Sequence, residues 1–428
     1  MFNKKIISWS FYDLANTAFS ALIVTLFFPV LIKVYMGGNE FQIGLVMGGS
    51  LLLSAIFVPF MGSISDALKV KKPFIILFTL LTVIFTILIA YTNLYIALIF
   101  GLLANLFYHG CLDIYDSLLY DIADNKKMGK VSGLGTAFGY VGTILSLGMA
   151  AIILNQFGWD TEIGTRMIFP ATGTFFIIFS MPLFIWVKDK RNKIIDFSKA
   201  MKIATKEIKE TLYHLKIVVH NLLISFINLI IKPFTKSKLK LIVEKNHEMY
   251  KNLWTFMLAS LIYVDAVNTL IIFLYLFGEN RIGISVKEFF PLFALMAVAA
   301  IFGSVLFGYL SDEIGPKKSL VTALILWIFV ILMLIIKTNY YTYVTAGMVG
   351  GALLGAIWTI TRPMLIQLSP KRKITEMFGF QGLTEKLGGF FGPVLFGLLV
   401  ISYGYTAALI SVLVFFILGL GLLLKVKI

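Results

Sequence analysis

Residues 62–66 read Gly-Ser-Ile-Ser-Asp, and residues 308–312 read Gly-Tyr-Leu-Ser-Asp. Each stretch ends a long apolar segment and is followed within a few residues by a pair of lysines. The two copies lie 246 residues apart (308 − 62), and the same offset relates other glycines, at Gly133 and Gly379 and at Gly142 and Gly388. The chain therefore contains two parallel copies of one apolar unit, a layout typical of proteins in which two halves rock about a central site.

The composition predicts a membrane protein. Hydrophobic residues make up 59% of the 428 residues, charged residues make up 14%, and the mean hydropathy is +0.91, so the bilayer must be the solvent. A span of about 30 Å requires roughly 20 apolar residues. Runs of this length occur at 10–35, 41–65, 73–92, 95–122, 131–154, 166–187, 252–277, 285–311, 319–336, 340–368, 375–401 and 405–424.

These runs predict an all-α membrane protein with twelve transmembrane helices in two pseudo-symmetric six-helix bundles, residues 1–187 and 252–428. Residues 188–251 form the linker between them. Apolar residues from Met201 to Leu229 recur every three or four positions among lysines and polar groups, which predicts a basic amphipathic helix on the cytoplasmic face of the bilayer. This linker could be a passive tether or could have a regulatory role.

The chain has a formal net charge of +15, and the positions of its basic residues follow the predicted membrane topology. Lysines gather in alternate connections between the spans, and the opposite connections carry few basic residues. This asymmetry predicts a multi-pass protein of the cell membrane with both termini in the cytoplasm. The basic excess therefore indicates no nucleic-acid partner. No cleavable signal peptide is expected, because the first apolar stretch is too long and has polar residues in its interior.

Charged side chains inside the predicted spans are expensive. A charge at the bilayer centre costs about 2.5–3.5 kcal/mol. The carboxylates in the spans are Asp13, Asp113, Asp116, Asp265 and Glu385, and the cations are Arg362 and Lys386. Because the carboxylates outnumber the cations, they must face a wet cavity, be protonated or hold a cation.

Polar residues in the fourth apolar run follow one helical stripe, since Asn105, His109, Asp113 and Asp116 fall at i, i+4, i+8 and i+11. Similar stripes occur on the first helix of each half, and polar residues also mark the tenth helix. We expect these helices to surround a common cavity. The candidates for a substrate and proton pathway are Asp13, Asn16, Thr17, Asn105, His109, Asp113, Asp116, Asp265, Asn268, Thr269, Arg362 and Glu385.

A proton relay is the favoured interpretation of the stripe in the fourth run, because histidine titrates near neutrality beside two carboxyl groups. A polar seam between packed helices is the alternative. Asp13 and Asp265 could act in packing or gating without meeting a substrate, and we expect Arg362 to pair with one of the acids. A metal at His109 is disfavoured, because the chain has only four histidines and none is near it in sequence.

Other chemistry finds little support in the sequence. Cys111 is the only cysteine, which excludes an internal disulfide and a cysteine-based metal cluster. No nucleotide-binding loop, nucleophile constellation or metal spacing stands out, so we expect neither an enzyme nor a cofactor. The expected partners are lipid, a small-molecule substrate and a coupling proton or cation, and we expect a monomer.

The repeated loops predict a gate. Gly62 and Gly308 permit close helix approach, and Asp66 and Asp312 could each meet the N-terminus of a neighbouring helix, whose partial positive charge favours a carboxylate. Such a contact would form a latch that breaks when the halves rock.

These loops resemble the signature of the major facilitator superfamily. Other motifs resemble the vacuole-effluxer-like family within it, at residues 12–19 (Tyr-Asp-Leu-Ala-Asn-Thr-Ala-Phe), 59–66, 118–123, 361–362 and 378–380. The resemblance implies alternating access and, from the family, export of amino acids. The chain departs from the superfamily pattern at Ala67 and Glu313, where an arginine follows the aspartate, and from the family pattern at Leu14, where a tryptophan is usual.

We therefore predict a secondary active transporter for a small polar solute, with an amino acid favoured and proton coupling expected. A cation-coupled sugar or organic-ion symporter is the alternative, because sugar symporters share a similar first-helix pattern. A lipid-handling protein and a sensor without transport are the further alternatives.

Overall fold

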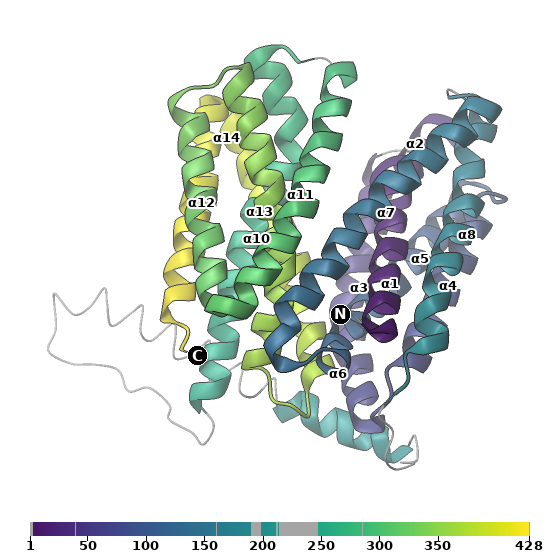
Figure 1. Ribbon diagram of the computed structural model, residues 1–428. Coiled ribbons are helices and arrows are strands. Elements are labelled where there is room, and N and C mark those ends of the chain that lie inside the picture. The colour runs from purple at the N-terminus through teal and green to yellow at the C-terminus, as the bar shows by residue number, and fades with distance from the viewer. Residues whose placement is uncertain are drawn as a thin grey trace, which may run out of the picture.

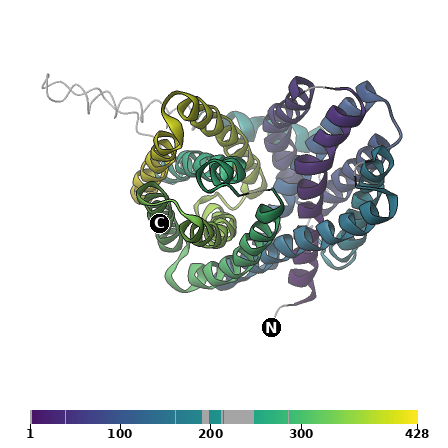
Figure 2. The same cartoon turned by 90° about the horizontal axis from the view of Figure 1, so that it is seen from above.

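The computed structural model describes residues 3–38, 40–159, 161–189, 198–210, 213, 247–284 and 286–427. These residues form two helical bundles that stand side by side (Figures 1 and 2). The N-terminal bundle contains α1 (Lys4–Phe19), η1 (Ser20–Phe27), α2 (Phe28–Val30), η2 (Leu31–Tyr35), α3 (Glu40–Leu68), α4 (Lys72–Ile89), α5 (Leu94–Ser117), α6 (Leu119–Ile122), η3 (Asn125–Lys127), α7 (Met128–Phe157) and α8 (Glu162–Trp186). The C-terminal bundle contains α10 (His247–Ile282), α11 (Val286–Ile314), α12 (Pro316–Ile336), α13 (Tyr340–Leu368) and α14 (Ile374–Lys425).

The helices follow the predicted spans closely. Ten helical segments of the described chain are long and apolar enough to cross a membrane. The helix α3 and the first arm of α14, which contain several undescribed side chains, occupy the places of the second and eleventh predicted spans. Within α14, Gly404 has a φ of 80°, a conformation that glycine adopts readily, and it separates the two arms where the sequence predicts a break.

Local sequence sets several helix ends. Asn3 and Asn93 cap α1 and α5, because each side chain accepts a hydrogen bond from a backbone N–H in the first turn. The chain then departs from α-helical geometry after Phe19, where η1 and η2 are π-helical. Such wide turns are rare and occur often at functional sites.

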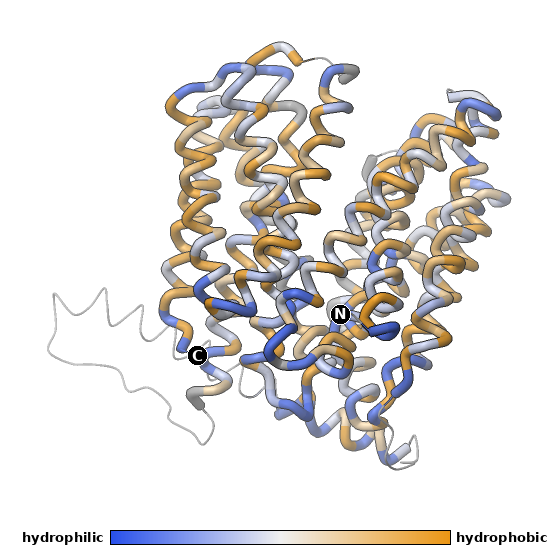
Figure 3. The backbone as a smooth tube through the Cα atoms, in the orientation of Figure 1, coloured by the Kyte–Doolittle hydropathy of each residue, from blue (hydrophilic) through white to orange (hydrophobic). Residues whose placement is uncertain are grey.

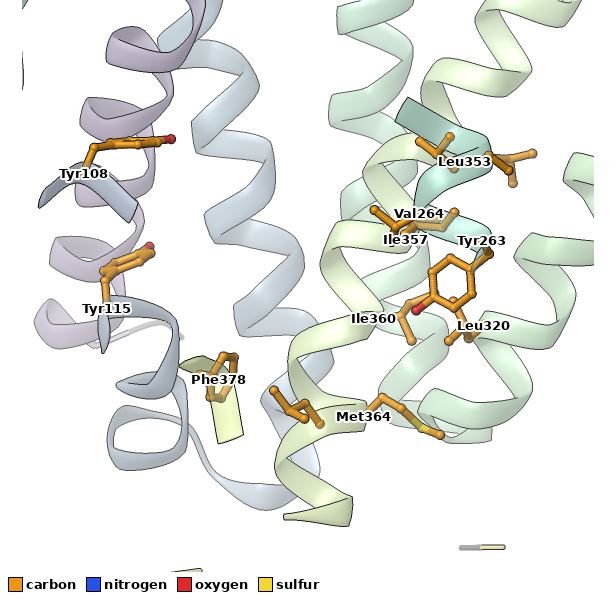
Figure 4. Packing of buried hydrophobic residues seen from close by; sticks show 14 of the residues in the cluster. Tyr108, Tyr115, Tyr263, Val264, Leu320, Leu353, Ile357, Ile360, Met364 and Phe378 are labelled. Carbon is orange, nitrogen blue, oxygen red and sulfur yellow. The ribbon is translucent and has the colours of Figure 1, made fainter. Parts of the chain in front are cut away.

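Apolar residues predominate along the middle of both bundles, and polar residues gather at the two ends (Figure 3). Phe302 and Ile336, for example, are 71% and 81% exposed. An apolar surface of this extent marks contact with a membrane. Inside each bundle, buried residues pack into a core, with Tyr108 and Tyr115 in the N-terminal bundle and Tyr263 and Ile357 in the C-terminal one (Figure 4).

Both termini lie toward one end of the molecule, here called the terminal end, and the bundles diverge toward the opposite end (Figure 1). Two aspartates join the bundles at the terminal end. Asp66 of α3 accepts hydrogen bonds from Thr375 Oγ1 at 2.6 Å and from the backbone N of Glu376 at 3.0 Å, at the start of α14. Asp312 of α11 accepts from the backbone N of Gly129 at 2.6 Å, at the start of α7.

The glycines of the same loops permit this approach. A Cβ on Gly62 would lie 2.8 Å from the carbonyl oxygen of Thr375, and a Cβ on Gly308 would lie 3.1 Å from the Cα of Gly133. Glu313 stands where the superfamily pattern has an arginine, and it forms an ion pair with Lys130 at 3.5 Å.

The described part of the linker packs across the terminal end. Residues 198–210 form a helix, drawn in teal at the bottom of Figure 1. Its Ala204 carbonyl accepts a hydrogen bond from Ser63 of α3 at 3.3 Å, and its Glu210 pairs with Lys373, just before α14, at 3.2 Å. The helix therefore contacts both bundles. The remaining apolar positions of the predicted amphipathic pattern, Leu212, Leu215, Val219, Leu222, Phe226 and Leu229, lie outside the described residues.

Candidate functional site

A polar cavity of about 560 Å³ lies between the bundles. Its walls come from α1, η1, α3, α5 and α7 on one side and from α10, α13 and α14 on the other. Nine of the predicted pathway residues line it, namely Asp13, Asn16, Thr17, His109, Asp113, Asp116, Asn268, Arg362 and Glu385. The fold thus brings residues from distant parts of the chain to one internal space.

Arg362 joins the two bundles at this cavity. Its Nη1 donates a hydrogen bond to Asp13 Oδ2 at 3.0 Å and to Thr136 Oγ1 at 3.3 Å. Its Nε forms an ion pair with Asp116 Oδ1 at 2.9 Å. The side chain of Arg362 is only 11% exposed, so these contacts form where little water competes. Pairing of this arginine with an acid was expected, and the structure adds a second acid.

The aromatic ring of Trp9 packs against the guanidinium of Arg362. The guanidinium carbon of Arg362 lies 5.3 Å from the centre of the Trp9 ring, within the range of a cation–π interaction. Trp9 stacks on Tyr115 at a centroid distance of 5.0 Å, and Tyr115 donates a hydrogen bond to the Trp9 carbonyl at 2.8 Å. We did not predict these two residues. The available signal was that Trp9 precedes Asp13 by one helical turn and so shares its face.

Asp113 and Glu385 face the cavity from opposite bundles. Glu385 accepts a hydrogen bond from Gln381 Nε2 at 3.1 Å, and Gln381 also donates to Ser260 at 2.7 Å. Asp113 lies against Gly382 of α14, where an added Cβ would meet its carboxyl carbon at 2.7 Å. A glycine at this position therefore lets α14 approach the carboxylate of α5.

Three predicted pathway residues do not line this cavity. Asn105 donates a hydrogen bond to Ser50 of α3 at 2.7 Å. Asp265 accepts one from the backbone N of Gly392 at 2.9 Å, and Thr269 donates to the Asp265 carbonyl at 2.7 Å. These contacts lie within single bundles. Those of Asn105 and Asp265 join two helices, and that of Thr269 lies within α10. Across the described residues, no group of three or more histidine, cysteine or acidic side chains could hold a metal ion.

A second cavity of about 340 Å³ adjoins the first toward the opposite end. The two share four lining residues, Thr17, Ser20, Tyr140 and Leu354. The second cavity is mainly apolar and contains several aromatic side chains, including Phe273, Phe277, Trp327, Tyr343 and Phe396.

Comparison with known proteins decides the family. The sequence model of the Major Facilitator Superfamily matches residues 14–313 and 255–427. The chain belongs to the major facilitator superfamily. It is therefore a multi-pass secondary transporter and not an enzyme, and the predicted all-helical fold is confirmed.

Two relatives cover most of the chain. One is an uncharacterised protein of Aquifex aeolicus, 25% identical over 391 residues, which are 91% of this chain and 87% of the relative. The other is YxiO of Bacillus subtilis, an uncharacterised MFS-type transporter, 25% identical over 439 residues, which are 99% of this chain and 94% of the relative.

Solved structures support the fold. The human organic anion transporter MFSD10 matches with a TM-score of 0.73 and 13% identity over 98% of this chain and 99% of that one. The Escherichia coli fucose:proton symporter FucP matches with a TM-score of 0.73 and 13% identity over 99% and 98%. The proton:xylose symporter XylE matches with a TM-score of 0.68 and 13% identity over 99% and 95%.

Proposed function

We propose that this transporter moves a small polar solute by alternating access and that proton exchange in the polar cavity drives the movement. The observation that carries the proposal is the polar cavity between two pseudo-symmetric bundles, with Arg362 of one bundle held by carboxylates of the other. A carrier requires a central site that each side of the membrane reaches in turn.

Proton coupling follows from the ion pairs. Asp13 and Asp116 hold Arg362 while they are ionised, so protonation of either carboxyl group would remove one of the contacts that join the bundles at this level. Separation of the bundles at the terminal end would then become easier. His109 and Asp113 line the same cavity and could pass protons toward these carboxyl groups.

The terminal end is cytoplasmic in this proposal. Basic residues gather in the connections at that end, as the positive-inside rule requires, and include Lys126, Lys317 and Lys371. Because the aspartate caps close the terminal end, the described conformation would be open toward the outside.

The substrate class rests on resemblance. Similarity to the vacuole-effluxer-like family favours an amino acid. A cation-coupled sugar or organic-ion symporter is the second candidate, and two structural neighbours are proton symporters for sugars. A lipid-handling role is disfavoured, because the charged residues line an internal cavity between the bundles.

The test uses purified protein reconstituted in vesicles with an imposed proton gradient. A thermal-shift screen of amino acids and sugars first selects a solute, since a ligand of the native state raises the apparent unfolding temperature. We expect Asp113→Asn to abolish gradient-driven accumulation of that solute and to spare its exchange at equal pH. Asp124→Asn, an exposed acid outside the cavity, is the matched control and should leave accumulation unchanged. Unchanged accumulation in Asp113→Asn would contradict the relay.

A further inference from the structure

We infer that the linker helix, residues 198–210, is a strap that keeps the terminal end closed and must release one bundle before this end can open. The linker is then a conformational element rather than a passive tether. The inference rests on the proposed alternating access, because that mechanism requires the terminal end to open and close in turn. The contacts that carry it do not depend on the substrate or the coupling ion.

Two seams close the terminal end, one between α3 and α14 and one between α7 and α11. At the α3–α14 seam, Asp66 accepts a hydrogen bond from the backbone N of Glu376 at 3.0 Å. A Cβ on Gly62 would lie 2.8 Å from the carbonyl oxygen of Thr375, so the two helices are in direct contact there. This seam must part when the bundles separate at the terminal end.

The linker helix contacts both sides of the α3–α14 seam. On one side, Ser63 of α3 donates a hydrogen bond to the Ala204 carbonyl at 3.3 Å. On the other side, Lys373, which directly precedes α14, donates from Nζ to the Glu207 carbonyl at 3.3 Å and pairs with Glu210 at 3.2 Å. Because α3 and α14 move apart when the terminal end opens, one of these two sets of contacts has to break.

The linker helix meets the rest of the protein through small side chains. Ala200 and Ala204, one helical turn apart, are both 0% exposed. The opposite face of the helix carries exposed lysines at positions 199, 202, 206 and 209. The sequence predicts an apolar face for this segment, and in the structure the part of that face at the two alanines is covered by protein.

The contact with Lys373 is the one that we expect to break. The Glu210 side chain of this ion pair is 52% exposed, and an ion pair so open to water contributes little to stability. The Lys373 side chain, which is only 8% exposed, would gain hydration on release. The hydrogen bond between Ser63 and Ala204 is buried, so the helix stays attached to α3.

The modification rate of a buried thiol measures how often this seam opens. In a Cys111→Ser background, Ser117→Cys places a thiol at a fully buried position of α5, where the serine oxygen lies 3.1 Å from Thr375 Oγ1. The full chain in nanodiscs is treated with a membrane-impermeant methanethiosulfonate. The rate follows the open population when closing is faster than modification. Ser180→Cys, at a fully buried position inside the N-terminal bundle, reports general loss of stability.

Two changes in the linker helix loosen the strap. Glu210→Gln removes the ion pair with Lys373, and we expect it to raise the modification rate at Ser117→Cys about two- to fivefold. Ala204→Leu places a larger side chain where the helix meets the protein and should raise this rate by at least about fivefold. Lys209→Gln, an exposed position on the same helix, is the matched control and should leave the rate unchanged.

The outcomes separate the strap from the proposed transport. Rates at Ser117→Cys that are the same in all three variants, or an equal acceleration at Ser180→Cys, overturn the inference even if proton-driven transport is observed. Acceleration confined to Ser117→Cys supports the strap, and if it came without any flux in vesicles it would contradict only the proposed transport. If Ala204→Leu fails to fold, Glu210→Gln still decides.

Discussion

At the scale of single residues, Arg362 organises the centre of the molecule. It contacts Asp13 of α1, Asp116 of α5 and Thr136 of α7, and it lies over the ring of Trp9. A planar guanidinium can contact several partners in fixed directions, whereas the single ammonium of lysine cannot. The arginine thus compensates two carboxylates that would otherwise be expensive in a membrane protein.

Replacement of Arg362 should show how much the buried carboxylates of Asp13 and Asp116 depend on it for their stability. We expect Arg362→Gln to lower stability by roughly 3 kcal/mol, because removing one partner leaves buried charges uncompensated. Adding Asp116→Asn should recover part of this loss, with a coupling of about 0.5–3 kcal/mol. The measurement is the apparent unfolding temperature of the single and double variants.

Lys130→Gln provides the control, because this lysine belongs to an exposed ion pair with Glu313 and should cost at most about 1 kcal/mol. If the double variant were as unstable as the sum of its two single changes, the coupling between Arg362 and Asp116 would be refuted.

At the scale of elements, the repeat produces two equivalent helix caps. Asp66 lies at the N-terminus of α14, and Asp312 lies at the N-terminus of α7, where each accepts backbone N–H groups. The capped residues obey the same offset as the loops, since Glu376 follows Lys130 by 246 residues (376 − 130). Each cap joins one bundle to the other, so both must break before the terminal end can open.

Neutralising either cap should favour opening of the terminal end. A negative charge at a helix N-terminus contributes about 0.3–1 kcal/mol, and up to about 2 kcal/mol where it is partly buried, so we expect Asp66→Asn or Asp312→Asn to raise the open population about 2- to 30-fold. The two changes should add, because they act at separate sites. Opening is measured as an increase in the distance between spin labels at Lys69 and Arg372, which are both exposed at the terminal end. Asp124→Asn is the control, and a distance distribution that stays the same in the double cap variant would rule out the latch.

At the scale of the whole molecule, most of the fold could be predicted, because long apolar runs and a repeated loop constrain it strongly. The twelve runs and the break near Gly404 required only hydropathy and the conformational freedom of glycine. The contacts between bundles were harder to predict. The sequence shows that Asp66 and Asp312 are equivalent, but only packing shows which helices they cap.

The candidate site was predictable in part. Helical periodicity places Asp113 and Asp116 on one face, and both line the cavity. Asn105 belongs to the same stripe on α5, and Asp265 belongs to a similar stripe on α10. Both residues nevertheless form hydrogen bonds within their own bundles. A stripe specifies a face of a helix and leaves open whether that face meets a cavity or a neighbouring helix. The aromatic support under Arg362 was missed because aromatic residues are common in membrane helices.

Access to the cavity tests the central claim most directly. In a Cys111→Ser background, Thr17→Cys places one thiol where both cavities meet. A membrane-impermeant trimethylammonium thiosulfonate is added to each face of oriented vesicles in turn, with Tyr341→Cys, which is 80% exposed, as the control for labelling. We predict labelling of Thr17→Cys from the face opposite the termini. If the Tyr341→Cys thiol reacts and the Thr17→Cys thiol is protected from both faces, no water-filled path reaches the site, and the transport account is contradicted.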